Sequence, residues 1–399
     1  MMLHNLPNGL ESTYESLLQA TVSRYPDRVE EIKKLLWCLC VAVWPLSASQ
    51  LSEILALQPE DTYLDPDAIT TDPYDALETI APLVMIDREV WKYETVKLCH
   101  YSLREYLCSS PLRNADHQFH VDQREAHSWL SLLCLQYLTV SLQFDLSNME
   151  RKLDPATTDI NHFLSYAALC WYYHMDDASG HPGYFARIKP YLDNAVDNAP
   201  DTSSWFTRAQ DIFRDHNPHH DAPLHSLVCF AIFADLEEVT SYLLSKMTDL
   251  DHHFPDGYTV LTAAARWDRP RIVRKLLRMG ASIDVPTLEK ELTPLHLAAE
   301  HASKGAFDIL LDAGADPHAR SKSLTTPLYR AARSGNVYIL TRLKEAGCDV
   351  NVRTYDNWTP LHEAVGLGNR EAVDLLVQWG ADIRATTDDG YVATPDEYL

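Results

Sequence analysis

The stretch TPLHLAAE at residues 293–300 decides the fold, because its opening tetrapeptide returns at a nearly fixed interval. TPLY begins at Thr326 and TPLH begins again at Thr359. Aligned on this position, units start at Ala222, Thr259, Thr293, Thr326, Thr359 and Val392, at intervals of 37, 34, 33, 33 and 33 residues. Such a period indicates a solenoid of stacked helical units. The C-terminal half therefore holds five units and part of a sixth.

The chemistry of each unit explains the recurrence. The Thr hydroxyl can accept hydrogen bonds at a helix start, and Pro fits the first helical position. A second helix with a Leu-Leu pair follows and ends where a left-handed residue stops a helix at low cost. These ends are predicted at Gly280, Gly314, Gly347 and Gly380.

With these residues and the Gly-Ala-Asp phrases at 314–316 and 380–382, the sequence resembles the ankyrin repeat family over residues 218–399. The resemblance implies stacked helix pairs with projecting finger loops and a concave face that binds other proteins. A solenoid also offers an extended surface rather than an enclosed cavity. Thr262 and Tyr329 depart from the His of the tetrapeptide, and the first unit needs an insertion at 229–233. We expect these units to be distorted.

The residue before each capping Thr should lie on the finger. This row consists of Tyr258, Leu292, Thr325, Trp358 and Tyr391. Exposed aromatic side chains are frequent energetic anchors of protein interfaces. We therefore predict that Tyr258, Leu292, Trp358 and Tyr391 contact a protein partner, while the alternative that the rings only cover neighbouring loops stays open.

A basic segment in the second unit is a secondary candidate for partner binding. Its cations are Arg266, Arg269, Arg271, Arg274, Lys275 and Arg278. The core of this patch is Arg271, Arg274, Lys275 and Arg278. A solvated helix face is the favoured alternative.

The N-terminal half predicts a mainly α fold with a short hairpin. A helix over 32–43 stops at Pro45, and Ser47 or Ser49 can cap the next helix. Strands are expected at 83–86 and 90–98 around a turn at 87–89, followed by a helix over 100–107. We predict a winged-helix-like region at 1–113, a helical bridge at 114–217 and an α-solenoid of ankyrin repeats at 218–399.

This half resembles the segment that follows the nucleotide-binding domain in fungal NACHT-ankyrin proteins, relatives of NOD-like receptors. The resemblance is carried by LPNGLESTYESLL (6–18), LLWCLCVAVWPLSASQLSEILAL (35–57), APLVMID (81–87), KLCHYSLREYL (97–107) and FLSYAALCWYYH (163–174). Gly9 is the one glycine in the first 179 residues, so the sequence lacks a P-loop and predicts no nucleotide site. The winged helix then serves as a base for the repeats, or meets a nucleotide-binding domain on another chain.

Charge excludes several classes of partner. The chain has 34 Lys and Arg against 57 Asp and Glu, a net charge of −23, and residues 1–217 alone have 16 against 31. Because phosphates and anionic membranes attract cationic surfaces, we expect no direct nucleic-acid or membrane binding. Glu30, Glu31 and Glu53 on the candidate recognition helices also disfavour DNA.

The sequence predicts a soluble intracellular protein, cytoplasmic or nuclear. No secretory signal is seen, and the longest apolar run, 35–46, is shorter than the roughly 20 residues of a membrane span. The eight cysteines are mostly scattered in apolar surroundings and indicate reduced thiols.

No catalytic site, metal site or cofactor is predicted. Asp215, His216, His219, His220 and Asp221 could hold zinc, but a solvated linker is the favoured interpretation. Cys99 and His100 are adjacent on a strand and would point to opposite faces. His225, His296 and His362 belong to the tetrapeptide.

The sequence therefore predicts a non-catalytic scaffold that binds a protein of unknown identity. Two alternatives remain: a nuclear transcription coregulator, and a sensor fragment that pairs in trans with a nucleotide-binding chain. We also expect the partial sixth unit to lack a capping repeat or to be completed by another subunit.

Overall fold

The computed structural model describes residues 10–57, 72, 74–87, 94–109, 112, 117–140, 162–197, 206, 209 and 226–393. The chain divides into two compact units, Met1–His220 and Asp221–Leu399. Each unit has its own buried core. Within the described residues, no helix is long and apolar enough to cross a membrane.

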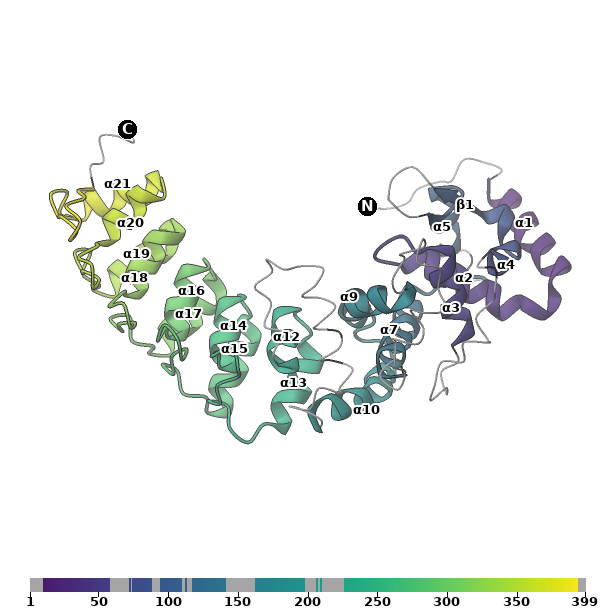
Figure 1. The fold of residues 1–399 in the computed structure, drawn as a ribbon, viewed down its shortest axis with the longest axis horizontal. Coiled ribbons are helices and arrows are strands. Elements are labelled where there is room, and N and C mark those ends of the chain that lie inside the picture. Colours follow the sequence, from purple (N-terminus) through teal and green to yellow (C-terminus); the bar gives the residue numbers. More distant parts are fainter. Residues whose placement is uncertain are drawn as a thin grey trace, which may run out of the picture. The chain divides into compact units, whose positions relative to one another are not determined.

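The C-terminal unit is a stack of five helix pairs (Figure 1). Inner helices here are the first of each pair, and outer helices are the second. The pairs are α12 (Leu227–Phe233) with α13 (Glu237–Lys246), α14 (Val260–Arg266) with α15 (Pro270–Met279), α16 (Pro294–Glu300) with α17 (Lys304–Asp312), α18 (Pro327–Ser334) with α19 (Val337–Glu345), and α20 (Pro360–Gly366) with α21 (Arg370–Gln378). The predicted α-solenoid is confirmed.

Helix starts and ends follow the predicted chemistry. Four inner helices are capped by a Thr whose hydroxyl accepts a hydrogen bond from the backbone N–H three residues later. These caps are Thr259, Thr293, Thr326 and Thr359. The four predicted glycines all adopt positive φ at the ends of the outer helices.

The predicted start of the first unit is wrong. Its inner helix is capped by Ser226, which lies 33 residues before Thr259, so no insertion exists. The segment 229–233, interpreted as an insertion, is most of α12 and is almost entirely buried. The buried apolar run of α12 therefore sets where the first repeat begins. The sequence Pro-Leu-His at 223–225 resembles the tetrapeptide but does not mark this start. Ala222 and His225 lie outside the described residues.

The single interval of 34 residues arises in one finger. The finger before Thr293 closes with a hydrogen bond from the N–H of Thr287 to the carbonyl of Leu292, spanning six residues. Equivalent bonds join Phe254 to Tyr258, Ser321 to Thr325, Thr354 to Trp358 and Thr387 to Tyr391, each spanning five residues. The extra residue is thus absorbed without changing either helix.

The expected distortion at Thr262 and Tyr329 does not occur. Thr262 completes a capping box with Thr259. Tyr329 lies at the same position of α18, and its hydroxyl donates to Glu363 of the next inner helix at 2.6 Å. Both helix starts stay capped, because the hydroxyls of Thr259 and Thr326 accept hydrogen bonds from the N–H groups of Thr262 and Tyr329.

The described part of the N-terminal unit is built mainly from helices. They are α1 (Leu10–Arg24), α2 (Val29–Val41), α3 (Ala48–Ala56), α4 (Asp75–Glu78), α5 (Tyr101–Leu107), α7 (Gln123–Val140), α9 (His162–Asp177) and α10 (Tyr184–Asp197). Ser47 caps α3 in a full capping box with Gln50, as one of the two predicted caps. Two left-handed glycines, Gly180 and Gly183, separate α9 from α10.

A short antiparallel hairpin lies between α4 and α5. Strand β1 (Val84–Asp87) pairs with β2 (Thr95–Leu98), and Leu46 adds an isolated bridge to Val96. Asp87, predicted in the turn, is the last residue of β1 and pairs with Thr95. The predicted start of the second strand lies outside the described residues.

Polar side chains are buried in the N-terminal core where three helices meet. Glu53 of α3 is 3% exposed and accepts hydrogen bonds from the hydroxyl of Tyr137 on α7 and the N–H of Phe163 on α9. Glu53, which the sequence analysis counted among the acidic residues that disfavour DNA binding, is buried and ties these helices together.

Candidate protein-binding face

The finger row is buried in its middle, half-buried at Tyr258 and exposed at Tyr391. Tyr258 and Trp358 are half-buried, and Tyr391 is 39% exposed. Leu292 is 4% exposed and Thr325 is 5% exposed, so both belong to the core. The prediction that Leu292 presents an interface side chain therefore fails, because this finger position packs into the core, as it does at Thr325 on a finger of ordinary length. The structure does not bring the row together as one continuous apolar line.

An aromatic cluster forms at the last described finger. The rings of Trp358 and Tyr391 stack with centroids 5.7 Å apart and an interplanar angle of 21°. His362 lies 5.8 Å from each ring. Its Nδ1 bonds the capping Thr359, and its Nε2 donates to the carbonyl of Ala385 at 3.0 Å. The cluster is therefore fixed on a rigid base.

The first finger of the row carries a different arrangement. The guanidinium of Arg266, on α14, lies 5.5 Å from the ring centroid of Tyr258 and 5.4 Å from that of Trp267. Arg266 also donates to the Tyr258 hydroxyl. Here the finger ring is covered by a cation of its own repeat.

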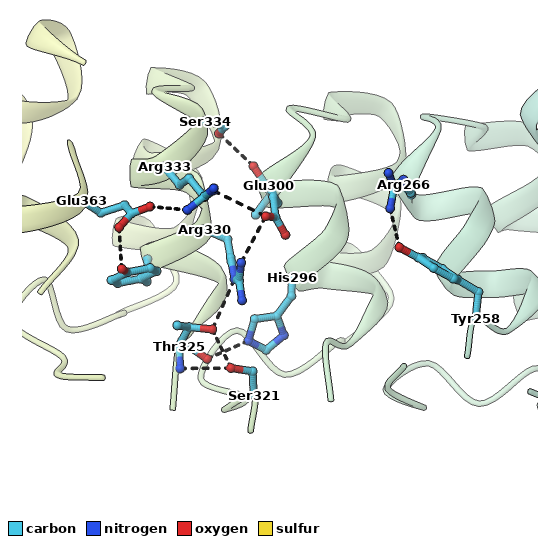
Figure 2. A network of polar contacts seen from close by, with 12 residues as sticks. Tyr258, Arg266, His296, Glu300, Ser321, Thr325, Arg330, Arg333, Ser334 and Glu363 are labelled. Carbon is cyan, nitrogen blue, oxygen red and sulfur yellow. Dashed lines mark hydrogen bonds and ion pairs between the residues drawn. The ribbon is translucent and has the colours of Figure 1, made fainter. Parts of the chain in front are cut away.

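Between these ends, the inner helices carry a ladder of opposite charges, defined as Glu300, Arg330, Arg333 and Glu363 (Figure 2). Glu300 pairs with Arg330 at 3.1 Å and with Arg333 at 3.6 Å. Arg333 reaches onward to Glu363 at 2.7 Å. The charge ladder therefore joins three consecutive repeats.

The charge ladder also touches the fingers. Arg330 donates to the hydroxyl of Thr325, which shares a 2.6 Å hydrogen bond with Ser321 on the same finger. Arg333 has 49% of its side chain exposed, whereas Glu363 has 9%. About half of the Arg333 side chain therefore stays in contact with solvent although it forms ion pairs.

Sequence reasoning missed this charge ladder, although a signal was present. Its members lie four or seven residues after the capping Thr, as seen for Arg330 and Arg333 after Thr326. Residues at equal positions of neighbouring repeats lie side by side in a solenoid. Comparing those positions across units would have revealed the alternation of charge.

The basic patch lies on the outer helix α15 and not on the finger row. Arg271, Arg274 and Arg278 are exposed, and Lys275 is half-buried. Arg271 pairs with Glu237 at 2.9 Å, where both side chains are largely solvated. Arg269, also in the predicted segment, instead donates to the carbonyls of Ile232 and Phe233 and joins two repeats. The exposed ion pair of Arg271 and Glu237 contributes little to stability.

The other sequence candidates show no catalytic arrangement among the described residues. His100 is the N-cap of α5, and its Nδ1 accepts a hydrogen bond from the N–H of Ser102 at 3.1 Å. Within the described ranges, no group of His, Cys, Asp and Glu is placed to hold a metal ion. The predicted cluster at 215–221 lies outside them.

The comparisons with known proteins agree with the architecture of the C-terminal unit. The family model "Ankyrin repeats (3 copies)" matches residues 224–321 and 295–387. The C-terminal half of the chain thus consists of ankyrin repeats. This coverage does not extend to the N-terminal unit.

Individual relatives match over limited spans. The chain is 25% identical over 181 residues to the azaphilone pigments biosynthesis cluster protein L of Monascus ruber, covering 44% of this chain and 36% of that protein. It is 32% identical over 103 residues to the human ankyrin repeat and SOCS box protein 11, covering 26% and 30%. It is 34% identical over 124 residues to delta-latroinsectotoxin-Lt1a of Latrodectus tredecimguttatus, covering 31% and 10%. The chain therefore spans about a third or less of these relatives.

Proposed function

We propose that this chain is a non-catalytic scaffold that binds a protein partner along the finger row and the charge ladder. The observation that carries the proposal is the stacked pair of Trp358 and Tyr391 on a rigid repeat, with Tyr391 39% exposed. Large rings held in place lose little conformational entropy on binding, which suits them as interface anchors.

The neighbouring surface supports the same role. The charge ladder supplies Arg333, and the far end of the row supplies Tyr258. Apolar anchors beside solvated charges form the usual pattern of a protein interface, in which charges add specificity and rate of association. The described face consists of side chains on a regular scaffold, which favours recognition over chemistry.

Partner capture tests the proposal. The chain is immobilised, proteins from the source cells are captured, and mass spectrometry compares the wild type with a Tyr258→Ala, Trp358→Ala, Tyr391→Ala variant. We expect a partner captured by the wild type to be lost or at least about tenfold depleted with the variant, since anchors carry most of the affinity.

A matched variant controls for lost apolar surface. Leu367, Val377 and Ile383 are exposed side chains of the fifth repeat outside the finger row. Their triple replacement by Ala should leave capture unchanged. The proposal is contradicted if both variants recover the same proteins as the wild type while their circular dichroism spectra match it.

The finer class that we propose is the fungal NACHT-ankyrin type, with the N-terminal unit as a winged-helix-like base. The hairpin β1–β2 between short helices supports this assignment. The identity of the captured partner decides among the alternatives. A transcription factor and nuclear location favour the coregulator, whereas capture of a nucleotide-binding chain that depends on ATP favours the sensor fragment.

A further inference from the structure

One position of the inner helices differs at the last described repeat. Seven residues after the capping Thr, successive repeats carry Arg266, Glu300, Arg333 and Gly366. In the second repeat this position supplies the guanidinium that lies over the finger ring of Tyr258. In the fifth repeat, glycine stands at this position and the finger ring is Trp358.

The missing side chain leaves space against the indole. A Cβ atom at Gly366 would meet a single atom of the described residues within 4 Å, Cζ3 of Trp358 at 3.9 Å. This is an ordinary van der Waals distance. Gly366 is the last residue of α20 and has no positive φ, so its backbone does not require glycine.

Among the described residues, no cation lies over the Trp358 ring, although six other aromatic rings carry one. Tyr391 stacks on the indole and His362 lies at its side. Burial lowers the pKa of His362, so this neighbour is neutral near pH 7. The aromatic surface beside Gly366 therefore keeps the electron-rich character that attracts cations.

The surrounding charge favours a cation as well. Residues 351–393 contain three Arg and seven Asp or Glu, a net charge of −4, whereas residues 259–292 contain seven Lys or Arg and four Asp or Glu, a net charge of +3. On the finger that carries Trp358, Asn357 bonds Asp388 of the next finger at 2.7 Å. An approaching cation thus meets an acidic end of the solenoid.

We propose that the space beside Gly366 receives an arginine side chain of the protein partner, with its guanidinium against the indole of Trp358. The contact reproduces, between two chains, the contact that Arg266 makes with Tyr258 within one repeat. Arginine fits better than lysine because its planar guanidinium stacks on aromatic rings and is more weakly hydrated. The inference rests on the proposed protein-binding function and specifies the chemistry of the partner.

The first test uses a small probe and no partner. N-acetyl-arginine methylamide is titrated into the full chain while the indole N–H resonance of Trp358, assigned with Trp358→Phe, is followed by NMR. The uncharged isostere N-acetyl-citrulline methylamide and N-acetyl-lysine methylamide serve as comparisons. We expect the arginine probe to shift this resonance and the citrulline probe to leave it unchanged, with the lysine response weaker. Equal responses to citrulline or lysine, or no response to arginine, overturn the proposal.

Gly366→Arg is the decisive variant. It supplies the guanidinium from the chain itself, as Arg266 does, so we expect the response of Trp358 to the arginine probe to be at least about fivefold weaker. Gly366→Ala adds only the Cβ and should retain most of the response to the arginine probe. A loss seen with Gly366→Arg but not with Gly366→Ala is then caused by the added guanidinium side chain and not by the Cβ. An undiminished response of Gly366→Arg overturns the proposal.

The partner assay is read separately. If the finger-row variant leaves capture unchanged, the proposed function fails whatever the probe shows. If capture depends on the finger row while Trp358 ignores the arginine probe, the protein-binding function stands and the arginine site is excluded.

Discussion

His296 and His362 each hold two neighbouring repeats together. Nδ1 of His296 accepts from the N–H of Thr293 at 3.2 Å, and Nε2 donates to the carbonyl of Thr325 at 3.0 Å. One ring nitrogen must therefore be unprotonated and the other protonated, which is the neutral imidazole. Burial lowers the pKa of His296 to about 4, in agreement with this state.

Replacing His296 isolates the contribution of the bond between repeats. Gln can still reach the N-cap backbone but not the carbonyl of the next finger, so we expect His296→Gln to lower the free energy of unfolding by about 1–2 kcal/mol. Urea denaturation followed by circular dichroism measures this change. His318→Gln, at an exposed position of a loop, is the control and should be nearly neutral. Equal effects of the two variants would count against the bridging role.

At the scale of elements, the fingers are tied to each other by backbone hydrogen bonds. The N–H of Leu288 donates to Gly257, that of Lys322 to Lys290, and that of Tyr355 to Ser323. Two residues before each helix cap, every described finger of the array has a positive φ. These positions are Gly257, Glu291, Leu324, Asn357 and Gly390. A side chain such as Leu pays a steric cost in this region.

Leu324 is the most strained of these positions by residue type, with φ 59°. Because Asn tolerates the left-handed region, we expect Leu324→Asn to raise the free energy of unfolding by roughly 0.5–1 kcal/mol. The comparison is Leu288→Asn, which removes an exposed Leu at a finger position that has no positive φ. Urea denaturation midpoints of both variants and the wild type measure this change in stability. A destabilised Leu324→Asn variant would show that the apolar contacts of Leu324 outweigh its backbone strain.

At the scale of the whole molecule, buried neutral histidines make both compact units sensitive to acid. In the N-terminal unit, His174 is 0% exposed and lies 2.8 Å from both His127 and the hydroxyl of Tyr166. Burial lowers the pKa of His174 to about 3 and also lowers that of His127. His296 has the corresponding role in the repeats.

The direction in which pH changes the free energy of unfolding follows from proton binding by the folded and unfolded chain. Below the ordinary histidine pKa of about 6.5, the unfolded chain binds protons that the folded chain cannot, so the free energy of unfolding falls as pH decreases. We expect urea midpoints to drop between pH 7 and pH 4, the window set by His296 and partly by His174. A His174→Gln, His296→Gln variant should show a shallower pH dependence. If its slope equals that of the wild type, these histidines do not govern the acid response.

The sequence alone determined the features that depend on a residue and its close neighbours along the chain. Thr caps, the glycines at helix ends, the Ser47 cap and the period of the repeats are local, because each rests on hydrogen bonds or φ preferences within a few residues. The finger-row aromatic residues Trp358 and Tyr391 were also named from spacing alone.

Only the tertiary structure decided which of the candidate side chains are exposed and which charges meet. The register of the first repeat followed the burial of α12, Leu292 is buried in the core, and Glu53 joins three helices. The charge ladder joins residues about 30 positions apart, and the space beside Gly366 lies against the ring of Trp358, eight positions earlier in the chain. Stacking of the repeats brings the charged residues together. A pattern of neighbouring sequence positions does not show which residues meet between repeats.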